Sequence, residues 1–195
     1  MKLLLLETTS GESYPVARLP SPAPGRDKSG RGTRVQRIRR SVRKAYRELS
    51  SRLPYHERLC AQLRRAQAIE VIHSSGMGEA GALAAFQGFL IARHRKHTLW
   101  LVLDVLLALG GAALTPIPGP NVFFFYPAAR CWGHHLARSG ARHALNHQEV
   151  SFEYEPLLDR LRSHLHEPEK RDAVLEEIAA RYNLGSLEKI SSALG

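Results

Sequence analysis

The chain has little cysteine and fewer acidic than basic side chains. Its two cysteines, Cys60 and Cys131, lie far apart in 195 residues. This excludes a disulfide framework and is typical of a protein from a reducing compartment. Lys and Arg total 28 against 18 Asp and Glu, which gives a formal net charge of +10. The excess lies in residues 1–148, so we expect a basic body that attracts phospholipid headgroups or nucleic acid.

The sequence also lacks the residue spacings that are typical of an active site. No nucleophile with a base and no pair of acids stands at a recognisable spacing, so we expect no enzyme, no catalytic residues and no cofactor. His143 and His147 are four residues apart, and Cys131, His134 and His135 precede them. Such residues bind transition metals. However, a second paired motif is missing and ten histidines produce such spacings by chance, so we expect no metal site.

A secretory apolar segment is missing from the amino terminus, because only residues 3–6 separate Lys2 from Glu7. We expect a short β-strand there, followed by a Pro-, Gly- and Ser-rich linker from Pro15 to Gly32. Strand and linker together occupy residues 1–32. The rest of the chain is predicted to be mainly α. It divides into basic amphipathic helices (33–97), an apolar hairpin (98–133) and a basic-to-acidic helical carboxyl-terminal region (134–195).

The chain has one long apolar run, residues 98–114, with a single acid, Asp104. As a helix it would measure about 25 Å, the short end of what crosses a bilayer. Three prolines in residues 116–120 prevent a regular helix from continuing. Residues 122–132 are apolar again but too few to return across a bilayer. The pattern predicts a Pro/Gly-broken membrane hairpin, with one short transmembrane or re-entrant helix plus an interfacial segment; a buried hairpin in a soluble helical protein is the alternative.

Charges on the flanks of this hairpin predict its orientation and its polar site. Basic residues stand before and after the hairpin, so both ends should face the cytoplasm or the matrix. Because a carboxylate is costly in a membrane, Asp104 is a functional candidate. We assign ion or proton coordination to Asp104 and Asn121, and we place Arg130, His134 and His143 at the mouth of the hairpin.

Residues 33–53 predict a basic amphipathic helix with an apolar stripe at three- and four-residue spacing. Such a helix adsorbs to anionic lipid, although a solvated helix packed on a neighbour has the same pattern. We expect an anionic phospholipid membrane as partner and no specific nucleic acid. The predicted lipid-binding residues are Arg34, Arg37, Arg39, Arg40, Arg43, Lys44 and Arg47. Further helices are predicted at 55–73, 79–96, 155–166 and 168–182, with a final short helix after residue 186.

One stretch of the chain resembles a known family. The resemblance is to the mitochondrial potassium/proton exchange-related proteins, of which this chain looks like a bacterial-type member. An apolar segment is followed by a Pro-Asn aromatic stretch, then by Arg, His, Ala, Gly and His in the same order. The residues that carry the resemblance are Pro116, Ile117, Pro118, Gly119, Pro120, Asn121, Val122, Phe123, Phe124, Phe125, Tyr126, Arg130, Trp132, His134, Ala137, Gly140, His143 and Leu145.

The resemblance implies a membrane protein linked to potassium and proton balance, as exchanger component or regulatory subunit. It would lie in the bacterial inner membrane, or in the mitochondrial inner membrane of a eukaryote. A single short hairpin cannot enclose a transport pathway, so an exchanger would need a homo-oligomer or a larger transporter partner. Two alternatives stay open: a peripheral scaffold that binds anionic lipid without transport, and a soluble helical protein that binds nucleic acid.

Overall fold

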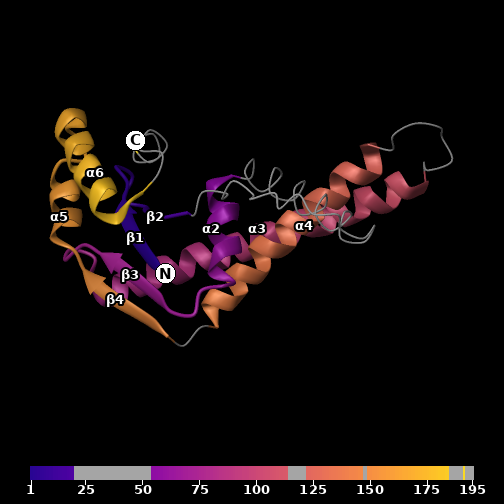
Figure 1. Ribbon diagram of the computed structural model, residues 1–195, viewed down its shortest axis with the longest axis horizontal. Helices are drawn as coiled ribbons and strands as arrows, with labels where there is room; N and C mark the ends of the chain where they lie inside the picture. Colours follow the sequence, from indigo (N-terminus) through magenta and orange to yellow (C-terminus); the bar gives the residue numbers. More distant parts are fainter. Residues whose placement is uncertain (20–53, 114–121, 147–148, 185–190, 192–195) are drawn as a thin grey trace, which may run out of the picture.

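The computed structural model describes residues 1–19, 54–113, 122–146, 149–184 and 191. These residues are mostly helical, as predicted, and they include a small mixed sheet (Figure 1). In chain order the elements are β1 (Lys2–Glu7), β2 (Ser13–Ala17), α2 (Tyr55–Leu63), β3 (Ile69–His73), α3 (Gly78–Ala113), α4 (Val122–Leu145), β4 (Val150–Tyr154), α5 (Pro156–Ser163) and α6 (Pro168–Tyr182). The predicted lipid-binding residues 34–47 and Asn121 lie outside the described residues.

The sheet has the strand order β2-β1-β3-β4. Strands β1 and β2 pair antiparallel, whereas β1 with β3 and β3 with β4 pair parallel. The central strand β1 begins with four successive leucines after Lys2, and all four are buried. Such a continuous apolar run is typical of a strand covered on both faces. The predicted amino-terminal strand is therefore confirmed.

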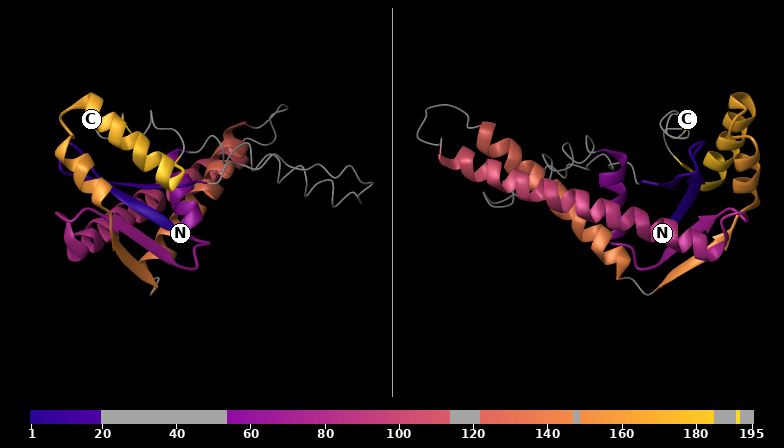
Figure 2. Two further views of the ribbon diagram at one scale, coloured as in Figure 1. Left: turned by 60° about the vertical axis from the view of Figure 1, so that its left-hand side comes forward. Right: turned by 180° about the vertical axis from the view of Figure 1, so that it is seen from behind.

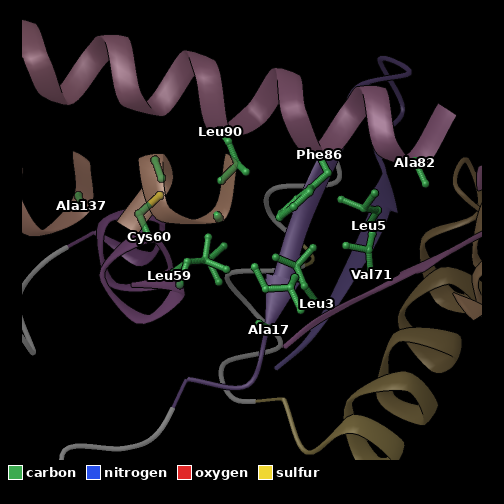
Figure 3. Packing of buried hydrophobic residues seen from close by; sticks show 14 residues of the cluster. Leu3, Leu5, Ala17, Leu59, Cys60, Val71, Ala82, Phe86, Leu90 and Ala137 are labelled. Atoms are coloured by element: carbon green, nitrogen blue, oxygen red, sulfur yellow. The ribbon is translucent and has the colours of Figure 1, made fainter. Parts of the chain in front are cut away.

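Helices cover both faces of the sheet. On one face, Leu3, Leu5 and Val71 pack against Phe86 and Leu90 of α3, and residues of α2 and α4 complete this core (Figure 3). On the other face, the even-numbered leucines of β1 pack against α5 and α6. Sheet and helices thus form a compact body from which the rest of α3 and α4 extends.

Helices α3 and α4 form an antiparallel pair that projects far beyond the sheet (Figures 1 and 2). The first half of α3 packs on the sheet through Ala82, Phe86 and Leu90. The second half of α3 runs alongside α4 (Figure 2). Among the described residues, no helix combines the length and the apolar character that a bilayer crossing needs. The transmembrane alternative in the predicted hairpin therefore has no counterpart among these helices.

Helix α2 crosses α4 at Gly140. A Cβ atom built on Gly140 would lie 1.7 Å from the carbonyl oxygen of Cys60 in α2. A side chain at this position would therefore overlap the α2 backbone, and Gly140 permits the close crossing. This contact, together with buried Leu59 and Leu63, attaches the base of the hairpin to the body.

The structure corrects four sequence-based predictions. Residues 122–132 are not a separate interfacial segment but the first turns of the long helix α4, which contains Pro127. Residues 13–17 form the edge strand β2, although the linker was predicted to begin near Pro15. The helix predicted over residues 55–73 ends at Leu63, and β3 follows it. Strand β4 was not predicted at all. The fold is thus a mixed sheet with helices rather than helices with one strand.

Candidate functional site

The distal half of α3 is apolar outside and polar inside. Leu99 and Leu109 expose 71% and 65% of their surface, whereas Asp104 exposes 4%. The buried residues His97, Asp104 and Gly111 are seven apart, so they share the face that packs on α4. In a protein surrounded by water, the leucines would lie inside and the aspartate outside. This hairpin has the opposite arrangement.

The buried Asp104 carboxylate pairs with Arg130 of α4. The Nε atom of Arg130 lies 3.4 Å from Oδ2 of Asp104. Two aromatic rings flank the guanidinium, with its central carbon 5.6 Å from the Trp100 ring and 5.8 Å from the Tyr126 ring. The Tyr126 hydroxyl also accepts a hydrogen bond from Arg130 at 3.3 Å. The charge of Asp104 is therefore balanced inside the hairpin, which lowers the cost of burying it.

His134, one turn further along α4, extends this pair into a network. Its Nε2 atom lies 3.4 Å from Oδ2 of Asp104 and 3.1 Å from Nη2 of Arg130. Burial is the largest of the effects that lower the pKa of His134, and Arg130 lowers it further, while Glu57 and Asp104 raise it. The net effect favours the uncharged imidazole.

A second histidine faces His134 from α3. The two Nδ1 atoms of His97 and His134 lie 3.1 Å apart, and Oε1 of Glu57 in α2 lies 3.9 Å from Nδ1 of His134. Burial, with smaller effects of His134 and neighbouring cations, lowers the pKa of His97 to about 4. The network thus runs from Arg130 and Asp104 through both histidines to Glu57, at the junction of three helices.

Basic side chains surround the base of the apolar half. Arg95 and Lys96 are exposed on α3, and Arg142 is exposed on α4. The pKa of His94 is lowered by burial and then by Arg138 and Arg142, so the basic residues of the two helices lie close together. We call Arg93, Arg95, Lys96, Arg138 and Arg142 the basic collar; its members on α3 lie between the apolar half of that helix and the residues that pack on the sheet.

The structure brings together three of the residues that the sequence selected, Asp104, Arg130 and His134. It places His143 elsewhere, 3.4 Å from the carbonyl oxygen of Ala66. Sequence reasoning missed Glu57, His97 and Trp100. His97 could have been found, because it stands seven residues before Asp104 and so shares its helix face. Nothing in the sequence pointed to Glu57, because its position depends on how α2 crosses the hairpin.

A sequence profile of the proteins described as mitochondrial K+-H+ exchange-related matches residues 28–147, which is more than half of the chain. The chain belongs to this family. The resemblance seen in the sequence is thus confirmed. No curated protein and no solved structure matches the chain.

The K+-H+ exchange-related region contains α2, β3, α3 and α4. It includes every member of the polar network. Strands β1, β2 and β4 and the pair α5 and α6 lie outside the matched residues, although β1 is central to the sheet. Four residues of the family resemblance, Arg130, His134, Ala137 and Gly140, lie on the α4 surface that contacts the network or the core. These four residues therefore lie on the inner face of α4, whereas Tyr126 and Trp132 of the same resemblance are exposed.

Proposed function

We propose that this protein is a membrane-associated component of a potassium/proton exchange system. Its hairpin would enter the bilayer from one side while the sheet body stays at the surface. The observation that carries the proposal is the inverted polarity of the hairpin, in which leucines are exposed and Asp104 is buried. Lipid tails are the surroundings in which exposed leucines are stable.

The dimensions of the hairpin support entry without crossing. Residues 98–113 of α3 rise by about 24 Å, less than the hydrocarbon core of a typical bilayer at about 30 Å. The two helices run antiparallel (Figure 1), so the sheet body at their base would lie on one side of the membrane. This agrees with the re-entrant form of the predicted hairpin.

The basic collar supports a surface position for the base of the hairpin. Its residues lie where the apolar half of α3 begins. Lys and Arg near an anionic membrane surface each contribute about 1 kcal/mol to binding. With the leucines in the acyl chains, the collar would lie at the level of the phosphates. The family description points to a mitochondrial association. The membrane we propose is the mitochondrial inner membrane, or the bacterial inner membrane for a bacterial member.

Within this component we assign the response to ions to the Asp104–Arg130 pair. Asp104 is the one acidic residue in the apolar half of α3. Arg130 lies beside its carboxylate, so a potassium ion could reach Asp104 only if the guanidinium moved away. Two helices do not enclose a pathway, so the chain would act as one subunit of an oligomer or as the regulatory partner of a transporter.

The test is potassium-driven proton movement in inner-membrane vesicles, followed with a pH-sensitive dye. Vesicles come from cells that lack the chain and from the same cells supplied with wild type, Asp104→Asn or Glu177→Gln. Glu177 pairs with Arg160 on the exposed surface of the body and is the control. We expect wild type and the control to restore the flux and Asp104→Asn to lose most of it, at equal amounts of membrane-bound protein. Equal flux with and without the wild-type chain would reject the proposed function. Full restoration of the flux by Asp104→Asn would show that Asp104 has no part in it.

A further inference from the structure

We propose that Glu57, His97 and His134 bind a divalent transition-metal ion, with zinc as the best fit. The three side chains come from α2, α3 and α4, and each offers one ligand atom, with all of these atoms within 4.8 Å of one another. Both histidines are buried, and the Glu57 side chain is 15% exposed. An ion would therefore be held inside the protein, and solvent would reach it from the side of Glu57.

The distances between ligand atoms fit tetrahedral coordination. Zinc lies about 2.0 to 2.1 Å from imidazole nitrogen and carboxylate oxygen, so two ligands at tetrahedral positions are about 3.3 Å apart. The two Nδ1 atoms are 3.1 Å apart, and Nδ1 of His134 is 3.9 Å from Oε1 of Glu57. Small side-chain movements would bring all three atoms to one ion. A water molecule would complete the coordination.

The surroundings of the histidines also suit a metal ion. A metal-bound imidazole usually contacts a carboxylate through its other nitrogen, which fixes the orientation of the ring. In His134, Nδ1 faces His97 and Glu57, while Nε2 lies 3.4 Å from Oδ2 of Asp104 and 3.1 Å from Nη2 of Arg130. With an ion on Nδ1, the Nε2–H group would donate to Asp104, and the Arg130 guanidinium would have to move away from Nε2. Asp104 would thus orient a ligand without binding the ion. Two imidazole nitrogens with one carboxylate are a ligand set that zinc binds well.

Metal binding would join α2 to the hairpin. The three ligands lie where the hairpin leaves the sheet body, and they come from different helices. An ion at this position would fix the angle between hairpin and body. The inference does not depend on membrane entry or on ion flux, since the ligands lie at the base of the apolar half.

The first experiment uses the full wild-type chain and zinc alone. Titration calorimetry should give one zinc ion per chain, and X-ray absorption of the loaded protein should show two imidazole groups with oxygen and no sulfur. Absence of binding, sulfur ligation through Cys131, or a different number of imidazoles would overturn the proposal. This readout needs no variant to fold.

The second experiment compares variants by the same titration. We expect His97→Gln and Glu57→Gln each to weaken zinc binding at least about tenfold, and Asp104→Asn to weaken it about 10- to 100-fold, as is usual for a carboxylate that orients a ligand. His135→Gln is the matched control, because His135 follows His134 directly on α4 but is exposed. Unchanged binding by both Glu57→Gln and His97→Gln, or loss only with His135→Gln, would assign the ion to surface histidines and contradict the proposal.

Discussion

At the scale of single residues, the hairpin buries one carboxylate that belongs to an otherwise apolar run of α3. Asp104 is tolerated there because Arg130 and His134 face it from the next helix. The guanidinium in turn lies against the rings of Trp100 and Tyr126, which attract a cation. Asp104 and Arg130 thus each have a partner that lowers the cost of their burial. The network is therefore sensitive to the loss of any one member.

We predict that Asp104→Asn destabilises the folded chain by about 1 to 3 kcal/mol, because the amide removes the negative charge beside Arg130. Urea unfolding followed by circular dichroism measures the change. Glu177→Gln breaks an ion pair in which both side chains are about half exposed, and such pairs contribute little. The control should change stability by less than about 0.5 kcal/mol. An equal effect of the two substitutions would mean that the buried pair does not stabilise the hairpin.

Sequence and structure agree on the residues whose chemistry is unusual for their surroundings. Asp104 was predictable because an acid within an apolar run is rare, and Arg130 and His134 were placed near the hairpin by the family resemblance. Glu57 was not predictable, because it is an ordinary glutamate in the first turn of α2. Its role arises only where α2 crosses the hairpin. Asn121 lies outside the described residues, so its assignment stays a prediction.

At the scale of elements, the crossing of α2 over α4 connects the hairpin to the body. The crossing is close because Gly140 has no side chain, and the carbonyl oxygen of Cys60 occupies the space where a Cβ would stand. Cys60 itself is fully buried, and burial raises the pKa of its thiol to about 12. It therefore acts as a small apolar residue in the core rather than as a reactive thiol.

Two glycine substitutions should have opposite effects on stability. In a helix, alanine is favoured over glycine by about 1 kcal/mol. Gly88 of α3 has open space around it, so Gly88→Ala should stabilise the chain by up to about 1 kcal/mol. Gly140→Ala must push α2 away from α4 and should destabilise by about 1 to 3 kcal/mol. Thermal unfolding of both variants measures the difference. Stabilisation by Gly140→Ala would show that the helices do not cross at this distance.

The elements that sequence analysis missed are the short strands. Residues 69–73 were assigned to a helix because their apolar residues continue the spacing of α2, yet three of them, Ile69, Val71 and Ile72, are β-branched and pack in the sheet. Pro15 argued for a loop, but β2 lies at the edge of the sheet, where proline is tolerated. By contrast, the helix predicted at 168–182 matches α6. Local pattern identifies long helices, whereas strand pairing depends on residues far apart in the sequence.

At the scale of the whole molecule, the chain has two parts with different surfaces. The sheet body has a buried core on each face of the sheet, as in proteins that fold in water. The projecting half of the hairpin instead exposes Val102, Leu106, Leu107 and Leu109. Along α3, Arg93, Arg95 and Lys96 of the basic collar lie between the two parts. This order, from body to collar to apolar hairpin, is the basis of the proposed association with a membrane.

The most direct test of this account is flotation of the purified chain with vesicles that contain anionic phospholipid, at high salt. The test variant carries Leu106→Arg and Leu109→Arg together, both on the exposed side of the hairpin. The matched control carries Leu83→Arg and Ile91→Arg, which are exposed on the part of α3 beside the body. Each arginine costs about 2.5 to 3.5 kcal/mol inside a bilayer, so two should lower membrane partitioning at least about a hundredfold. We expect wild type and control to float and the test variant to stay with the soluble fraction. Flotation of the test variant equal to that of wild type, or release of wild type by salt, would contradict insertion of the hairpin.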